Sequence, residues 1–135
     1  MRQFSIIAIG LVVCFVFGPM PCLALGTFTV TNQPITNFAT WAATGNAQPL
    51  VGDFNGDGKT DVALTGPSSW STLPVAFSNG NGTFNVTNQP ITSFATWAAT
   101  GNAQPLVGDF NGNGKTDVAL TGPSSWSTLP VAFSQ

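Results

Sequence analysis

The chain has 135 residues, the size of one small domain, and a net charge of −2 from three Lys or Arg and five acidic side chains. It contains no His, Tyr or Glu and no cluster of basic residues. Nucleic acid is therefore not an expected partner, and most general bases and covalent nucleophiles are missing. This composition predicts a binding protein, not an enzyme.

Residues 1–24 are predicted to be a secretory signal peptide. Arg2 supplies the positive start, residues 4–18 are almost entirely apolar, and Cys22-Leu23-Ala24 forms a small-x-small cleavage site. An uncleaved membrane anchor is the alternative, but the apolar run is shorter than the ~20 residues that span a bilayer. Both cysteines of the chain lie in this segment. We expect a secreted, extracellular protein that begins near Leu25, with no disulfide and no membrane span.

The remaining chain is one unit written twice. Residues 26–78 recur as residues 82–134, a shift of 56, with three differences, which are Thr29/Asn85, Asn37/Ser93 and Asp57/Asn113. We assign the repeats to residues 25–81 and 82–135. A period near 50 residues is typical of propellers and other arrays, in which one unit cannot bury its apolar face alone.

Each repeat has the pattern of short antiparallel strands separated by Gly, Pro, Asn and Ser clusters. In the first repeat the predicted strands are residues 27–31, 49–54, 61–65 and 73–77. Residues 38–43 are interpreted as a further strand or as a connector, and no window has convincing helical periodicity. The predicted fold is all-β, with two four-stranded antiparallel propeller blades per chain.

The strand order places a blade boundary inside the repeats. The first blade is predicted to run from Leu50 to Thr87, and the second starts at Leu106 and lacks a fourth strand, whose counterpart is residues 27–31. Two blades cannot close a ring. We therefore expect either a homo-oligomer with strand exchange or a part of a longer array. A trimer would have six blades and a tetramer eight, within the usual range of about four to eight.

All five Asp side chains lie in two Gly-rich loops, and their alternating positions indicate a calcium site in each loop. Ca²⁺ takes oxygen ligands from carboxylates, Asn side chains and backbone carbonyls. The predicted ligands are Asp53, Asn55, Asp57, Asp61 and the Lys59 carbonyl, and then Asp109, Asn111, Asn113, Asp117 and the Lys115 carbonyl. An EF-hand is excluded because Leu64 stands at the twelfth position, where that loop needs Glu. Metal-free hairpin turns, with Lys neutralising the carboxylates, are the alternative.

Two stretches resemble a known family. Gly52-Asp-Phe-Asn-Gly-Asp-Gly-Lys-Thr-Asp-Val-Ala-Leu64 resembles the calcium loop of the FG-GAP/VCBS repeats of integrin-like β-propellers. Residues 73–84 are similar to the repeats of fungal and bacterial propeller lectins of the Psathyrella velutina type. The family's Phe-Gly and Gly-Ala-Pro signatures appear here only as Phe77-Ser78 and Gly66-Pro67. The resemblance implies structural ions, with sugars bound between neighbouring blades.

The residues also favour sugar on their own account, because a nearly uncharged chain rich in Asn, Gln, Ser and Thr suits neutral hydroxyl groups. Trp70 and Trp126 lie in polar turns and are the candidate stacking platforms, since indole stacks well on a pyranose. The candidate polar partners are Asn46, Gln48, Asn102 and Gln104. We expect a secreted, calcium-binding, multivalent lectin that binds glycans. The alternative is an integrin-like protein-interaction or surface-scaffold module without sugar binding.

Overall fold

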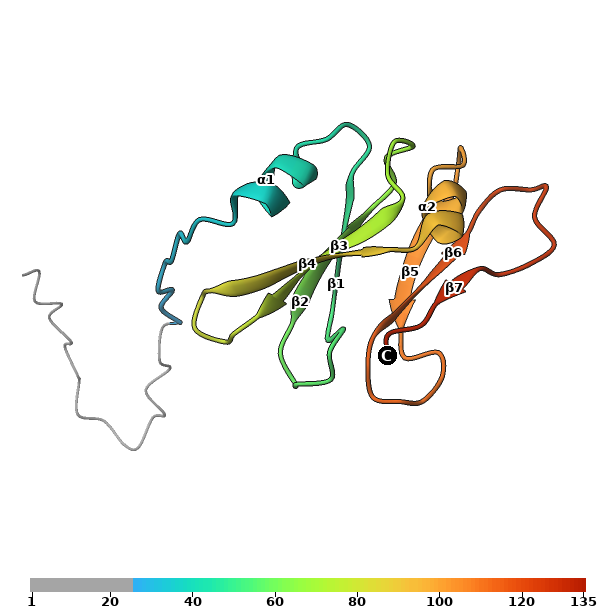
Figure 1. The fold of residues 1–135 in the computed structure, drawn as a ribbon. Helices are drawn as coiled ribbons and strands as arrows, with labels where there is room; N and C mark the ends of the chain where they lie inside the picture. Colours follow the sequence, from blue (N-terminus) through green and yellow to red (C-terminus); the bar gives the residue numbers. More distant parts are fainter. Residues whose placement is uncertain (1–25) are drawn as a thin grey trace, which may run out of the picture. The chain divides into compact units, whose positions relative to one another are not determined.

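The computed structural model describes residues 26–135 as two antiparallel sheets and two short helices (Figure 1). The predicted signal peptide lies outside the described residues. The chain divides into residues 1–30 and a compact unit of residues 31–135, which contains both sheets and both helices. No helix among the described residues has the length and apolar character needed to cross a membrane.

The first sheet is a complete four-stranded blade with the strands in sequence order. Its strands are β1 (Gln48–Gly52), β2 (Asp61–Thr65), β3 (Thr72–Ser78) and β4 (Phe84–Pro90). All neighbours pair antiparallel, and the first acidic loop joins β1 to β2. The predicted position of the first blade, with its fourth strand taken from the second repeat, is confirmed.

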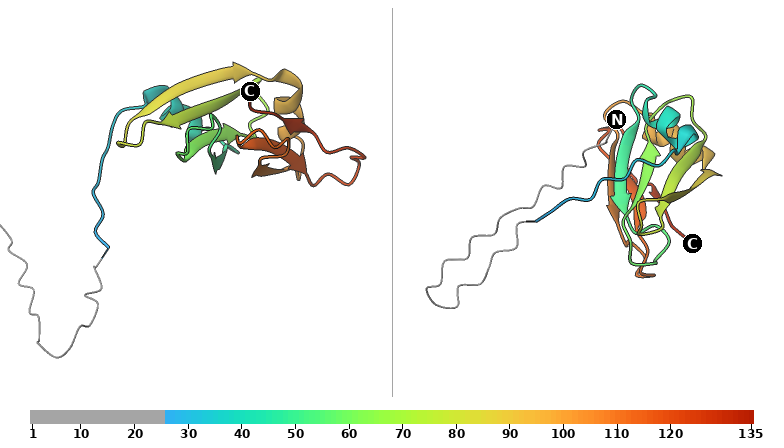
Figure 2. Two further views of the ribbon diagram at one scale, coloured as in Figure 1. Left: turned by 90° about the horizontal axis from the view of Figure 1, so that it is seen from below. Right: turned by 90° about the vertical axis from the view of Figure 1, so that its left-hand side faces the viewer.

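The second sheet repeats this plan with three strands. They are β5 (Gln104–Gly108), β6 (Asp117–Thr121) and β7 (Val131–Ala132). The second acidic loop joins β5 to β6, and β1 and β5 lie beside each other. The sheet has no fourth strand among the described residues, as the strand order predicted. Figure 2 shows the two sheets from two further directions.

Two sequence predictions are wrong. Residues 38–43 were expected to be a strand or a connector, but α1 (Thr36–Ala42) and α2 (Thr92–Ala98) are helices. Residues 27–31, predicted as a strand, have neither helix nor strand in the structure. Each helix has seven residues, too short for a helical period to stand out, and packing supplies most of the stability of such a helix. Phe38 of α1 and its counterpart Phe94 of α2 are buried and provide this packing, and α2 also buries Ala95 and Ala98.

Sheet 1 is covered on both faces because successive side chains of a strand point to opposite sides. Leu50, Ala63 and Val75 share the face that packs with Val118 and Leu120 of sheet 2. On the opposite face, Leu64 and Ala76 pack against Phe38 of α1. The helix and sheet 2 therefore lie on opposite sides of sheet 1 (Figure 1).

Leu64→Ala should destabilise the fold by about 2–5 kcal/mol, because it removes a fully buried side chain and leaves a cavity between β2 and α1. The matched control is Val51→Ala, an exposed position on the neighbouring strand, which should change the free energy of unfolding by about 0.5 kcal/mol or less. Urea denaturation followed by tryptophan fluorescence measures both. Equal losses in the two variants would contradict the described core.

Candidate functional site

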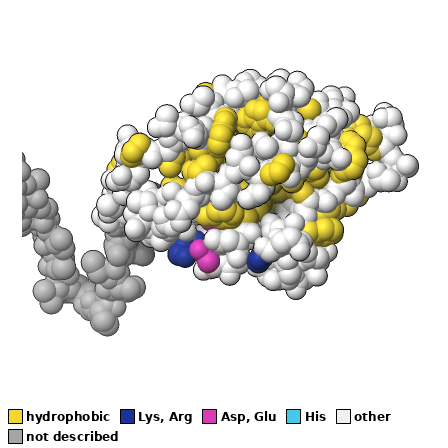
Figure 3. Space-filling view, viewed as in Figure 1, with side chains coloured by type: hydrophobic (Ala, Val, Ile, Leu, Met, Phe, Trp, Pro, Cys, Tyr) yellow, Lys and Arg dark blue, Asp and Glu magenta, His cyan; other side chains and the backbone are white. Residues whose placement is uncertain are grey.

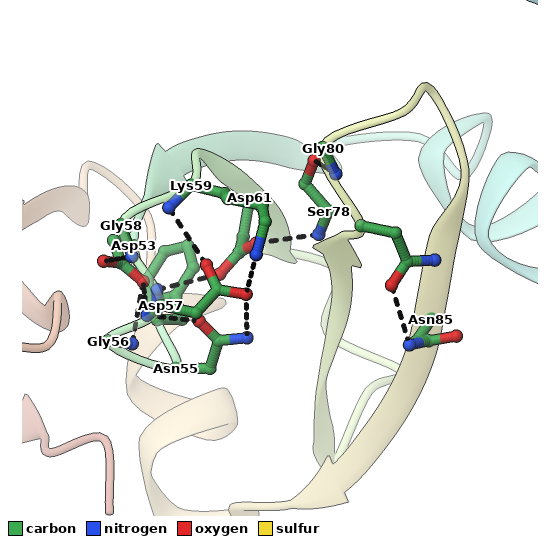
Figure 4. Close-up of polar contacts among 12 residues, drawn as sticks. Asp53, Asn55, Gly56, Asp57, Gly58, Lys59, Asp61, Ser78, Gly80 and Asn85 are labelled. Carbon is green, nitrogen blue, oxygen red and sulfur yellow. Dashed lines mark hydrogen bonds and ion pairs between the residues drawn. The ribbon is translucent and has the colours of Figure 1, made fainter.

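The first acidic loop is wrapped around the carboxylate of Asp53. This carboxylate accepts hydrogen bonds from the backbone N–H groups of Gly56, Asp57 and Gly58 at 2.7, 3.0 and 2.8 Å (Figure 4). Gly56 and Gly58 have φ angles of 78° and 79°, in the region that glycine adopts without steric cost. The glycines are therefore needed for the turn that brings these donors together.

Asp57 makes the loop's ion pair. Lys59 Nζ lies 2.8 Å from Asp57 Oδ2, and the Asn55 side-chain amide donates to the same oxygen at 3.2 Å. The Lys59 side chain, the largest cause, helps to hold the pKa of Asp57 below its usual value. Both partners are partly exposed, so solvent screens the pair and it contributes little to stability. The neutralising role that the metal-free interpretation gave to Lys59 is present in this geometry.

Asp61 is fully buried and ties the loop to the sheet. Its two carboxylate oxygens accept hydrogen bonds from the N–H groups of Phe54, at 3.0 Å, and Ser78, at 2.8 Å. Ser78 ends β3, so one side chain connects the acidic loop to a strand seventeen residues further along the chain. The sequence analysis missed Ser78. The Phe-Ser pair that recurs in both repeats, at the end of β3 and directly after β7, was the available signal.

The second loop repeats the hydrogen bonds between carboxylates and backbone N–H groups that the first loop makes. Asp109 accepts from Gly112, Asn113 and Gly114, and Asp117 accepts from Phe110 and Ser134. Backbone donation, above all from Gly114, lowers the pKa of Asp109. Asn113 stands where Asp57 stands in the first loop, and its amide donates to the Ser134 carbonyl at 2.9 Å. The second loop therefore keeps its geometry without an acidic side chain at this position.

The oxygen-rich composition of each loop fits the chemistry of Ca²⁺. Each carboxylate oxygen that accepts one N–H retains capacity for a further interaction. Within residues 26–135, no three His, Cys, Asp or Glu side chains group as a metal site. Asp57 is directed at Lys59, so it would have to exchange this partner for an ion. The ligand sets named above remain a prediction.

Thr116 joins the two acidic loops. The Asp53 N–H donates to Thr116 Oγ1 at 3.0 Å, and the Thr116 N–H donates to the Asp53 carbonyl at 2.7 Å. A Cβ atom at Gly52 would overlap the Thr116 side chain, which explains the glycine at the end of β1. This contact could not be predicted from the sequence, because it depends on how the two sheets lie together.

The predicted sugar residues lie at equivalent places on the two sheets. Trp70 is half-buried against the cluster of Phe38, Leu64 and Ala76, and Trp126 is half-buried against the core cluster to which both sheets contribute. In the first sheet, the Asn46 carbonyl lies against Gly66 and Gln48 pairs with Thr65. The counterparts Asn102 and Gln104 lie in the same way against Gly122 and Thr121.

The turn that carries each of these tryptophans thus begins beside its Asn and Gln, at one end of a sheet. Trp97 is 45% exposed, although only Trp70 and Trp126 were predicted to be stacking platforms.

The sheets and their repeated loops define an all-β, propeller-like repeat protein. The model of the FG-GAP-like repeat family matches residues 53–120, just over half of the chain. The chain belongs to this family. No curated protein and no solved structure matches it.

Asp61→Asn should lower the free energy of unfolding by about 1–3 kcal/mol, because an amide N–H₂ would face a buried N–H donor. Asp57→Asn is the matched control, since Asn occupies the equivalent position 113 in the second loop, and it should cost about 1 kcal/mol or less. Both variants are measured by thermal unfolding in excess chelator, so that bound ions do not contribute. A larger loss for Asp57→Asn would refute the structural role of Asp61.

Proposed function

We propose that this protein is a secreted, calcium-stabilised carbohydrate-binding protein that presents several equivalent sugar sites. The observation that carries the proposal is the pair of acidic loops, each of which encloses one buried aspartate and one aspartate that organises the backbone N–H groups. Membership of the FG-GAP-like repeat family supports the repeat-module part of this proposal. Calcium, sugar and secretion are the parts that the experiments below test.

The distribution of charge supports a role for the loops in ion binding. The few charged side chains visible in Figure 3 gather at one edge of the molecule, and the rest of that face is neutral or apolar. Asp53 and Asp61 are held by backbone and strand contacts, so their positions are set before an ion arrives. Such preorganisation lowers the cost of ordering the site on binding.

The tryptophan turns support a neutral, hydroxyl-rich ligand. Trp70 follows Ser68 and Ser69 in a turn closed by a hydrogen bond from the Trp70 N–H to the Pro67 carbonyl at 3.1 Å. An indole that is partly exposed offers both a flat apolar face and an N–H donor. The same arrangement recurs at Trp126, so each chain would present two equivalent weak sites. Several such sites on one assembly would gain avidity of roughly 10²–10⁴-fold on a glycan-coated surface.

Calcium should stabilise the protein by mass action. At a free concentration 100 times its dissociation constant, one ion that binds only the folded state adds about 2.7 kcal/mol. Isothermal titration should resolve two classes of site, because the second loop has Asn113 in place of Asp57. Asp57→Asn makes the loops alike and should leave one weaker class. An unchanged melting temperature in EDTA and no heat on titration would refute the proposed calcium binding.

Sugar binding should depend on the turn tryptophans. The double variant Trp70→Ala and Trp126→Ala should lose at least tenfold in affinity on a glycan array, because it removes about 1.4 kcal/mol or more per site of stacking. The matched control is Trp97→Ala, at a more exposed position outside the proposed sites, which should bind as the unchanged protein does. Circular dichroism verifies that both variants are folded. Full binding by the double variant would refute this site.

A protein-interaction module is the second candidate, and one observation favours it. Large apolar side chains in and beside sheet 2 are exposed, namely Leu106 of β5 and Phe110, Leu129 and Phe133 in the adjoining loops. A blank glycan array from folded protein would favour this candidate. An enzyme is not proposed, because the loop carboxylates serve backbone and strand contacts and do not face each other across a cleft as glycosidase pairs do.

A further inference from the structure

The packing of the two sheets within one chain provides a template for a second interface. Leu50 and Phe54 of the first blade are 8% and 5% exposed, because Val118 and Leu120 of sheet 2 and Phe94 of α2 lie against this face. The contact is head to tail, since it joins one face of the first blade to the opposite face of the second. A head-to-tail contact of this kind can be repeated by a further blade.

Within residues 26–135, the far face of sheet 2 lacks such a cover. Leu106 and Phe110, the counterparts of Leu50 and Phe54, are each 46% exposed. Figure 3 shows apolar side chains reaching the surface over much of one side of the molecule. The face has the same sequence as the covered face of sheet 1, so the surface that fits it is already present in this chain.

That complementary surface is the α1 side of sheet 1. In α2, Ala95 and Ala98 are 4% and 5% exposed, in keeping with the packing of Ala98 against sheet 1. Their counterparts in α1, Ala39 and Ala42, are exposed. The chain therefore presents the two halves of its own internal interface uncovered, one on each blade.

The open edge of sheet 2, along β7, indicates that a further strand is needed to complete the interface. A groove of about 460 Å³ lies between β7 and sheet 1, lined among others by Leu73, Phe77, Ile91 and Ala132. In sheet 1, β4 occupies the corresponding place along β3. Residues 28–34 have the sequence of β4 except for Thr29, which is Asn85 in β4. The sequence that would complete sheet 2 is thus present in the chain but is not a strand there.

We propose that residues 28–34 of a second copy of this chain form the fourth strand of sheet 2, and that the α1 side of that copy covers Leu106 and Phe110. The register of β3 with β4, moved by the repeat shift, pairs Val131 with Thr31 and Phe133 with Thr29 of the second copy. The side chains of Phe28 and Val30 then correspond to Phe84 and Val86, which line the α1 side of sheet 1 together with Ala76.

The chain's own residues 28–34 cannot take this place. Ile35 packs with Phe38 in the α1 cluster, on the face of sheet 1 opposite to sheet 2. The register requires Pro34 to lie opposite Thr128, beside β7. Pro34 is bonded to Ile35, and consecutive Cα atoms are only about 3.8 Å apart. Sheet 1 stands between the two positions, so the strand must come from another chain.

The acidic loops extend the same contact. Thr116 of the second blade exchanges two hydrogen bonds with the main chain of Asp53 in the first blade. Its counterpart Thr60 is exposed. In the proposed assembly, Thr60 of the second copy bonds to the main chain of Asp109. Each copy thus donates a strand, a helix face and a threonine to one neighbour and receives them from the other, and such head-to-tail contacts form a ring if the rotation between neighbours closes.

Native mass spectrometry of the secreted protein tests the assembly, and it needs neither sugar nor added calcium. The expected mass is a single multiple of the chain. Val30→Asp, which puts a charge into the apolar groove, should shift at least 90% of the protein to monomer. Thr29→Asn is the matched control, because it makes the segment identical to β4, and the mass should stay that of the assembly. A monomer for the unchanged protein at micromolar concentration would overturn the proposal.

Cross-linking keeps the proposal testable if Val30→Asp misfolds. In a background with Cys14→Ser and Cys22→Ser, chains with Thr31→Cys are mixed with chains with Val131→Cys, after denaturation and joint refolding. Paired strands place opposite Cα atoms about 4.5–5.5 Å apart, within disulfide range. The expected product is a disulfide-linked pair of chains on a non-reducing gel. Absence of this product would contradict strand exchange. So would a disulfide within a single chain in a variant that carries both Thr31→Cys and Val131→Cys.

The proposal for sugar binding can fail while this assembly stands, because mass and cross-links do not depend on a glycan. Conversely, a monomer that binds sugar would overturn the assembly and leave the sugar site in place.

Discussion

Each sheet of this protein has two apolar faces, and each face needs a neighbour. The period of two along a strand places Leu50 and Val75 on one side of sheet 1 and Leu64 and Ala76 on the other. Sheet 2 covers the first side and α1 the second. Sheet 2 has the same sequence and the same need, yet Leu106 on its far side remains exposed. The hydrophobic effect acts on this area as strongly as on the covered face, so the arrangement favours further copies of the same contact.

The acidic loops stabilise the fold in addition to any role in binding. Asp61 and Asp117 are fully buried, and each holds its loop to the chain beyond it, at Ser78, the last residue of β3, and at Ser134, two residues after β7. Any ion that these loops bind would therefore act on strand positions and, through Thr116, on the contact between sheets. This explains why a protein with few charges and no disulfide in its repeats places all its carboxylates in two loops.

The sequence was sufficient for the β-sheets and insufficient for the helices and the interblade contacts. The shift of 56 residues and the turn residues located the four strands of the first blade and the open place in the second. The helices α1 and α2 were missed because a period of 3.6 cannot be recognised in seven residues, of which α1 buries only Phe38 and α2 buries Phe94, Ala95 and Ala98. Thr116 and Ser78 were missed because their partners are set by tertiary packing.

Strand exchange between copies is the central claim, and hydrogen–deuterium exchange of the donated strand measures it most directly. Residues 30–34 and 86–90 have identical sequences, so their amides exchange at nearly the same rate when unprotected. In β4 the second segment is hydrogen-bonded to β3. Strand exchange predicts that residues 30–34 are protected to within tenfold of residues 86–90 in the folded protein. Rapid exchange of residues 30–34 beside a protected β4 would contradict it.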